Sequence, residues 1–147
     1  MIKRKTIGGI LTVVTLLVMV VSAGGESSAA PEGIGYSHST LGFSLILPSG
    51  WAQRYRVEEN QNSAWFVSLH NENAGFGGLL FGVEVFDEKP EIPTQYAELL
   101  HIGGKYFYAI YPGDIEWAYE NASLTKEYHD MYNDIEGILK TFRYTAK

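Results

Sequence analysis

Residues 63–86 constrain the fold more than any other part of the chain, because they combine two strand-like stretches with a run of turn formers. Residues 64–70 and 79–86 are rich in β-branched and aromatic side chains, and Asn and Gly dominate residues 71–78 between them. This pattern is typical of two strands joined by a turn. We therefore predict a central β-hairpin, around which the rest of a sheet is built.

The register of this hairpin is predicted from the alternation of side chains between the two faces of a strand. Trp65 and Val67 share the cleaner apolar face of the first strand. We expect that face to match the apolar face of the second strand, because a slip of one residue would turn every side chain over. Gly82 interrupts the second strand and predicts a bulge or an overlying aromatic ring, or else a ligand close to bare backbone. The apolar face of the second strand consists of Leu79, Phe81, Val83 and Val85.

The N-terminal residues have the order of a secretory signal. Lys3, Arg4 and Lys5 precede an uncharged apolar run of 15 residues, 7–21, and small or polar residues follow up to position 30. The run is shorter than the ~20 residues that a membrane-spanning helix needs. We therefore predict a signal peptide at residues 1–30, a linker at 31–35, a single domain at 36–147 and a secreted, extracellular location. The alternative is an uncleaved segment that retains the protein at the membrane.

The predicted mature chain is acidic. Without residues 1–30 it keeps eight of the 11 basic residues and 16 of the 17 acidic residues. Nucleic acids are bound through clustered Lys and Arg side chains, so this balance excludes them as partners. It also disfavours anionic membrane surfaces, which leaves an uncleaved N-terminal anchor as the predicted route to a membrane.

The absence of cysteine restricts the chemistry further. The chain has no Cys and four His, which excludes disulfides, thiol catalysis and cysteine zinc sites. We predict no metal and no cofactor. All 20 aromatic residues lie beyond residue 35, and they supply the large apolar areas from which a domain of this size builds a core.

The first half of the domain predicts an antiparallel meander, because four strands follow one another with short turns. The first strand is predicted at residues 36–47, before a turn at Pro48-Ser49-Gly50. The second is predicted at residues 53–58, where Tyr55 and Val57 alternate with charged side chains. That alternation favours an edge position with one face in water.

The second half predicts two helices and one more strand. A short helix is predicted at residues 94–101, because Gly103-Gly104 resembles a helix stop. Residues 105–111 are apolar on both faces and predict an interior strand. From Leu124 onward, apolar residues recur every three or four positions, which predicts a long helix capped by Asn121 or Ser123. The fold class is therefore α+β: an antiparallel β-meander sheet flanked by helices, with the C-terminal helix packed on it.

Several short motifs follow one another along the domain. In chain order they are Tyr36-Ser37, Leu41-Gly42-Phe43-Ser44, Pro48-Ser49-Gly50-Trp51, Gly77-Gly78-Leu79-Leu80-Phe81, Gly103-Gly104-Lys105-Tyr106-Phe107-Tyr108, Asp114, Glu127-Tyr128 and Ile138-Leu139-Lys140-Thr141-Phe142. This order of motifs resembles the PsbP-like fold, and it is also similar to small secreted proteins of Gram-positive bacteria without an assigned activity. The resemblance implies an α/β/α sandwich and a binding or accessory role, and it implies no catalytic residues.

The candidate catalytic residues are His70, Glu84 and Asp114. His70 and Glu84 are expected on the mixed face of the central hairpin, where a carboxylate beside an imidazole serves either as a general-base pair or as an ordinary cross-strand ion pair. The chain lacks a Gly-x-Ser-x-Gly motif, so the nucleophile elbow of the α/β-hydrolases is missing. A small extracellular hydrolase using His70 with Glu84 or Asp114 is therefore the alternative function.

The candidate binding residues are aromatic: Phe76 at the tip of the hairpin loop, and Tyr106, Tyr108 and Trp117, which either line a groove for a sugar or peptide or belong to the core. The leading prediction is a secreted, non-enzymatic binding or accessory module for an extracellular protein, peptide or glycan. A further alternative is an inhibitor that presents residues 71–78.

Overall fold

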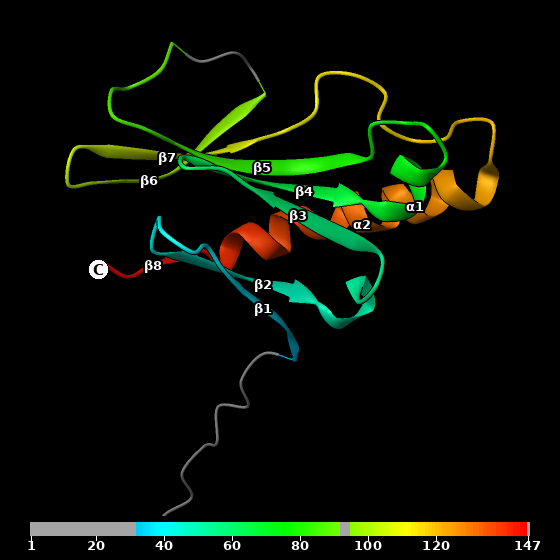
Figure 1. The fold of residues 1–147 in the computed structure, drawn as a ribbon, viewed down its shortest axis with the longest axis horizontal. Helices are drawn as coiled ribbons and strands as arrows, with labels where there is room; N and C mark the ends of the chain where they lie inside the picture. The colour runs from blue at the N-terminus through cyan, green and yellow to red at the C-terminus, as the bar shows by residue number, and fades with distance from the viewer. Residues whose placement is uncertain (1–31, 92–94, 147) are drawn as a thin grey trace, which may run out of the picture.

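The computed structural model describes residues 32–91 and 95–146. It shows an α+β protein in which two antiparallel sheets and one long C-terminal helix pack together (Figure 1). The predicted signal peptide lies outside the described residues. The three-stranded sheet has the order β1-β2-β8, and the five-stranded sheet has the order β3-β4-β5-β7-β6. The C-terminal helix, α2, and the three-stranded sheet lie on the same side of the five-stranded sheet (Figure 1).

The three-stranded sheet replaces the single strand that was predicted at residues 36–47. Two strands, β1 (Gly33–Ser37) and β2 (Phe43–Pro48), form an antiparallel hairpin, and β8 (Arg143–Tyr144) pairs with the other edge of β2. The chain reverses at Gly42, whose φ of 72° favours glycine. Since β1 begins at Gly33, the predicted linker at 31–35 is partly a strand.

The five-stranded sheet contains the central hairpin and confirms two predicted positions. β3 (Tyr55–Glu59) is an edge strand, and β7 (Lys105–Ile110) lies in the interior between β5 and β6. The hairpin strands are β4 (Ser63–Ser68) and β5 (Leu79–Phe86). A short helix, α1 (Leu69–Asn73), follows β4 directly, so the predicted strand at 64–70 ends two residues before His70.

The observed register of the hairpin differs from the predicted one. Phe66 lies opposite Phe81, and their rings stack with centroids 4.4 Å apart. Trp65, which was expected to share the face of Phe81, lies opposite Gly82 on the other face. A Cβ on Gly82 would come within 2.3 Å of the Trp65 ring, which confirms the overlying aromatic ring that the glycine predicted. The pairing of β4 with β5 also shifts register between Phe66 and Val67, so that Val67 lies opposite Leu79.

The predicted helix at 94–101 is wrong, because this segment forms β6 (Tyr96–Ile102) and pairs with β7. Gly103 and Gly104 have φ angles of 59° and 75°. Positive φ at both central residues is the signature of a type I′ hairpin turn. The two glycines therefore join two strands rather than end a helix, and the segment adds a strand to the sheet.

Helix α2 (Ala122–Lys140) confirms the predicted long helix and its cap. The Asn121 Oδ1 atom accepts hydrogen bonds from the backbone N–H groups of Ser123 and Leu124, at 3.1 and 3.2 Å. The apolar face of α2 packs against β2 and β5. Its buried residues are Tyr128, Met131, Ile135 and Ile138.

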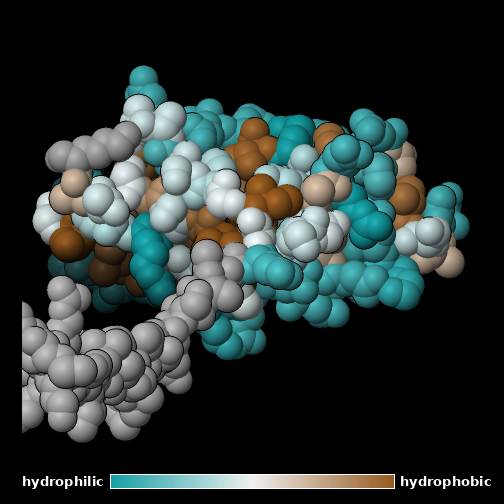
Figure 2. Space-filling view, turned by 90° about the horizontal axis from the view of Figure 1, so that it is seen from below, coloured by the Kyte–Doolittle hydropathy of each residue, from teal (hydrophilic) through white to brown (hydrophobic). Residues whose placement is uncertain are grey.

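The core lies where α2 and the two sheets meet. From the side of α2 and β1–β2, hydrophilic residues cover most of the surface, and hydrophobic residues show in separate places (Figure 2). None of the described helices is both long and apolar enough to cross a membrane. The largest fully buried core side chains are Trp51, Tyr128, Phe43, Phe66, Phe81 and Phe107.

Candidate functional site

A pocket of about 360 Å³ opens between the first half of α2 and the loop that precedes this helix. We call it the aromatic pocket. Its volume lies within the range of small-molecule sites, and concave, largely apolar pockets with a few polar groups are typical of them. The side chains that line it and carry rings or polar groups are Asp114, Trp117, Tyr128, His129, Tyr132 and Asn133.

Four of these side chains come from one side of α2, because positions separated by about one turn lie above one another on a helix. The Tyr128 and Tyr132 rings stack with centroids 6.1 Å apart. The Trp117 ring from the loop meets the His129 ring edge to face at 4.7 Å and an interplanar angle of 84°. Trp117 also contacts Tyr128 at 5.4 Å. The rings therefore form a bent aromatic wall rather than a flat stack.

The inner end of this wall is held by the Tyr128 hydroxyl, which donates a hydrogen bond to the backbone oxygen of Leu79 in β5. The Tyr128 side chain is buried, and burial, together with the negative charge of Glu116, raises the pKa of Tyr128 well above its usual value. The phenol therefore stays protonated and remains a donor, which fixes the ring at the base of the pocket.

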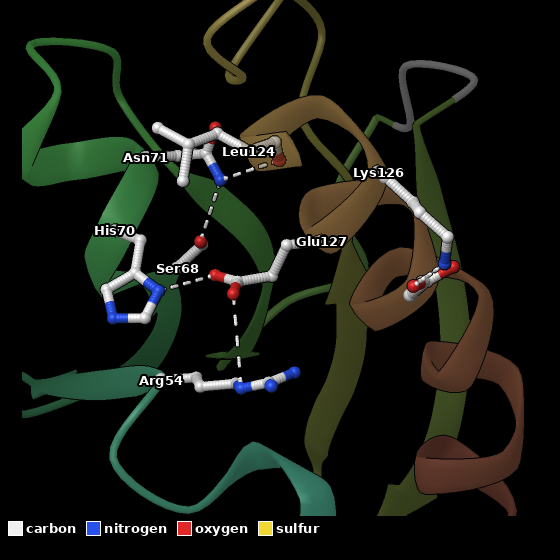
Figure 3. A network of polar contacts seen from close by, with 8 residues as sticks. Arg54, Ser68, His70, Asn71, Leu124, Lys126 and Glu127 are labelled. Carbon is white, nitrogen blue, oxygen red and sulfur yellow. Dashed lines mark hydrogen bonds and ion pairs between the residues drawn. The ribbon is translucent and has the colours of Figure 1, made fainter. Parts of the chain in front are cut away.

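The loop that carries Trp117 is fixed by Asn71, a fully buried residue of α1. The Asn71 Oδ1 atom accepts a hydrogen bond from the Ala118 N–H at 2.9 Å. Its Nδ2 atom donates to the backbone oxygen of Leu124 at 3.3 Å and to the Ser68 hydroxyl at 3.1 Å (Figure 3). One carboxamide thus ties the pocket loop and the start of α2 to the end of β4.

A second attachment of the loop runs through Glu116. The Glu116 backbone oxygen accepts from the Gly78 N–H at 2.8 Å, and its carboxylate accepts from the Leu79 N–H at 3.3 Å. Both bonds connect the loop to the start of β5. The loop is therefore held on both sides of Trp117, so the pocket wall is formed before any ligand enters.

Three polar side chains of the pocket have hydrogen-bond donors or acceptors that no described residue uses. Within residues 32–91 and 95–146, the side chains of Asp114 and Asn133 make no hydrogen bond or ion pair, and His129 makes ring contacts only. Asp114 supplies a carboxylate, Asn133 an amide, and His129 one donor and one acceptor when neutral. The pocket thus joins apolar ring faces with unused polar groups.

The structure does not bring the three candidate catalytic residues together. The His70 Nδ1 atom lies 2.8 Å from Glu127 Oε1 of α2, and Arg54 Nε lies 3.9 Å from Glu127 Oε2 (Figure 3).

Glu84 lies near the far end of β5, about 16 Å along the strand from Leu79 at 3.3 Å per residue. There it accepts from Asn62 at 3.4 Å, and burial raises its pKa. Asp114 lies in the aromatic pocket.

The candidate binding residues also separate, and only Trp117 belongs to the aromatic pocket. Phe76 is half-buried, and its ring meets the Tyr119 ring edge to face with centroids 5.5 Å apart. Tyr106 and Tyr108 lie on the other face of β7 from the core residue Phe107, because side chains alternate along a strand. Tyr108 is fully buried and donates to Glu98 at 2.9 Å, so of the two alternatives given for this residue it fits the core and not a groove.

Sequence reasoning missed the contribution of α2 to the site. Tyr128 belongs to the apolar stripe that begins at Leu124 and predicts the helix, and its ring is buried there, but the same ring also lines the pocket. Tyr132 and Asn133 fall outside that stripe, and the spacing of Tyr128 and Tyr132 by one helical turn was the available signal.

Among the described ranges, no group of three His, Asp or Glu side chains is arranged to hold a metal ion. No family model, curated protein or solved structure matches the chain.

Proposed function

We propose that the protein is a non-enzymatic extracellular binding module and that it takes a small ligand, or part of a larger one, in the aromatic pocket. The observation that carries the proposal is the preformed wall of Trp117, Tyr128 and Tyr132 beside polar side chains that pair with no residue of the described chain. A wall that is fixed in advance lowers the entropy lost on binding. A preformed aromatic wall of this kind supports binding affinity by itself.

Catalysis is the less supported alternative. The His70 imidazole has a carboxylate partner in Glu127 and its side chain is 46% exposed, which would suit a general base. Ser68, the nearest serine in sequence, is fully buried and accepts a hydrogen bond from Asn71. It is therefore held as a structural group rather than presented as a nucleophile.

We also propose that the protein is secreted after loss of residues 1–30 and that its core follows the PsbP-like arrangement. The basic, apolar and small-residue order of the N-terminus supports secretion. An antiparallel sheet with a long C-terminal helix on one face supports the arrangement. Mass spectrometry of the protein from culture medium tests the cleavage, and superposition of the five-stranded sheet and α2 on PsbP proteins tests the fold.

The binding proposal is tested by titrating the protein with small sugars, short peptides and amino-acid derivatives while recording ¹H–¹⁵N NMR spectra. We expect a ligand to shift the indole N–H of Trp117 and the backbone amides of 128–133, and Trp117→Ala to abolish the response. Tyr106→Ala is the matched control, because it removes an aromatic ring from the face of β7 opposite to the core residue Phe107. This variant should bind the ligand normally. Turnover of an ester, peptide or glycan that disappears in His70→Ala would overturn the proposal.

A further inference from the structure

The surroundings of the aromatic pocket carry a strong negative charge. Residues 111–136, which include both the loop and the pocket half of α2, contain seven acidic residues and one lysine. Three of the seven acids already face a cation: Asp130 pairs with Lys126 at 2.5 Å, Glu136 with Lys140 at 2.7 Å, and Glu127 lies 3.9 Å from Arg54. The other four acids make no ion pair with any described residue. An excess of one charge sign around a cleft attracts ligands of the opposite sign. The field of this segment therefore favours a cation and opposes a phosphate or carboxylate ligand.

The walls of the pocket suit the same kind of ligand. A cation placed over the face of an aromatic ring is attracted by the ring quadrupole, most strongly with Trp and then with Tyr. Trp117 and Tyr132 are only partly buried, so their ring surfaces remain accessible. The Trp117 and His129 rings stand almost perpendicular, which gives a cation two ring surfaces in one corner.

Asp114 completes the set of groups. Its carboxylate lines the pocket and makes no ion pair with any described residue. A cation that enters would supply the counter-charge that this carboxylate lacks within the described chain. Aromatic faces and an unpaired carboxylate together recognise a positively charged nitrogen that carries apolar groups, because the rings receive the apolar surface and the carboxylate balances the charge.

We propose that the aromatic pocket binds an alkylammonium cation, with Trp117 and Tyr132 against the apolar groups and Asp114 as the counter-charge. This inference rests on the proposed function, since it names the ligand chemistry of the same pocket. The ammonium group belongs either to a small free molecule or to a lysine side chain of a peptide, and the recognition chemistry is shared.

The experiment compares pairs of probes that differ in charge but hardly in shape. Choline is titrated against 3,3-dimethylbutan-1-ol, its neutral carbon isostere, and an end-blocked Gly-Lys-Gly peptide against the same peptide with acetylated lysine. Binding is followed by calorimetry and by the Trp117 indole N–H signal. We expect the charged member of at least one pair to bind about tenfold or more tightly than the neutral member, and the pair that responds identifies the source of the ammonium group.

Two charge variants locate the effect. Asp114→Asn should weaken binding of the cation by about tenfold or less, since the rings remain, and should leave the neutral probe unchanged. Asp87→Asn removes the same charge at the end of β5, where the Asp87 side chain is 86% exposed and paired with Lys105 at 2.6 Å, and should bind like the wild type. Equal weakening by both variants would overturn the role of Asp114.

The outcomes separate this inference from the proposed function. If the neutral members bind as tightly as the charged ones, or if a neutral saccharide shifts Trp117 while neither cation does, the pocket is a binding site and the cation proposal is wrong. If no probe, charged or neutral, shifts Trp117, both proposals fall. If the cations bind but shift only residues outside the pocket, the site assignment is wrong.

Discussion

The carboxamide of Asn71 accepts a hydrogen bond from the backbone N–H of Ala118, 47 positions further along the chain, at 2.9 Å. Both residues are buried, and this contact joins α1 to the loop that carries Trp117. A short helix that the sequence pattern did not reveal thus positions the wall of the candidate site.

Asn71→Ala should lower the free energy of unfolding by about 1–3 kcal/mol, because the Ala118 N–H is left buried without its acceptor. Urea denaturation measures the loss, and hydrogen exchange of the Ala118 amide should accelerate. The matched control is Asn73→Ala in the same helix, at an exposed position, which should change stability by about 0.5 kcal/mol or less. Equal effects of the two substitutions would contradict the anchoring role of Asn71.

Gly82→Ala should destabilise the protein by about 1–3 kcal/mol, because the added Cβ would lie 2.3 Å from a ring atom of Trp65. Thermal or urea unfolding measures the change. Replacing Trp65 with Leu in the same chain should recover part of the loss, since the two positions are in direct contact. Additive effects of the two substitutions would show that the ring does not lie over Gly82.

Gly137→Ala should have the opposite effect on stability to Gly82→Ala. A Cβ at this position of α2 meets nothing within 4 Å, and alanine is favoured over glycine inside a helix. We expect a gain of about 0.4–1 kcal/mol in the free energy of unfolding. A loss of stability would mean that the exposed side of α2 is covered by another part of the protein.

In the turn between β6 and β7, the effect of a substitution on stability should depend on how well the new residue tolerates a positive φ. Gly103→Asn should be nearly neutral, because Asn is common in type I′ turns, whereas Gly104→Val should cost about 1–2 kcal/mol, because β-branched residues avoid the left-handed region. Denaturant titrations of both variants provide the measurement. Equal stability of the two would contradict the hairpin and revive the predicted helix end.

Acid should weaken the contact between Arg56 in β3 and Glu72 in α1. Arg56 Nε donates to Glu72 Oε2 at 2.7 Å, and the Arg56 guanidinium lowers the pKa of Glu72 below its usual 4.5. The unfolded chain therefore binds a proton before the folded chain does, so this contribution is complete above about pH 4.5 and is lost as the pH falls through the lower folded value.

Unfolding in urea at pH 6, 4 and 3 tests this pH dependence. Glu72→Gln should flatten the loss of stability on acidification, because the group that titrates is gone. Glu120→Gln, at an exposed position before α2, is the control and should follow the wild type. A wild-type slope in Glu72→Gln would show that the contact with Arg56 does not contribute to the acid response.

Local signals in the sequence predicted several elements correctly. The bounds of β5, the edge position of β3 and the interior position of β7 followed from the period-two alternation of apolar residues. Helix α2 and its Asn121 cap followed from the 3.6-residue period and from capping chemistry. These features depend on which face of each segment avoids water, and that information lies within a few neighbouring residues.

Tertiary structure decided the rest, because the same local pattern fits more than one arrangement. Gly103-Gly104 suits a helix end or a type I′ turn, and pairing of β6 with β7 selects the turn. The face of Trp65 depends on a register shift in β4 and on the bare backbone of Gly82. The aromatic pocket joins a loop to one side of α2, and the buried hydrogen bonds of Asn71 and Tyr128 hold them together. Long-range contacts of this kind have no local period, so the sequence by itself determined which segments pack, and the folded chain determined which residues meet.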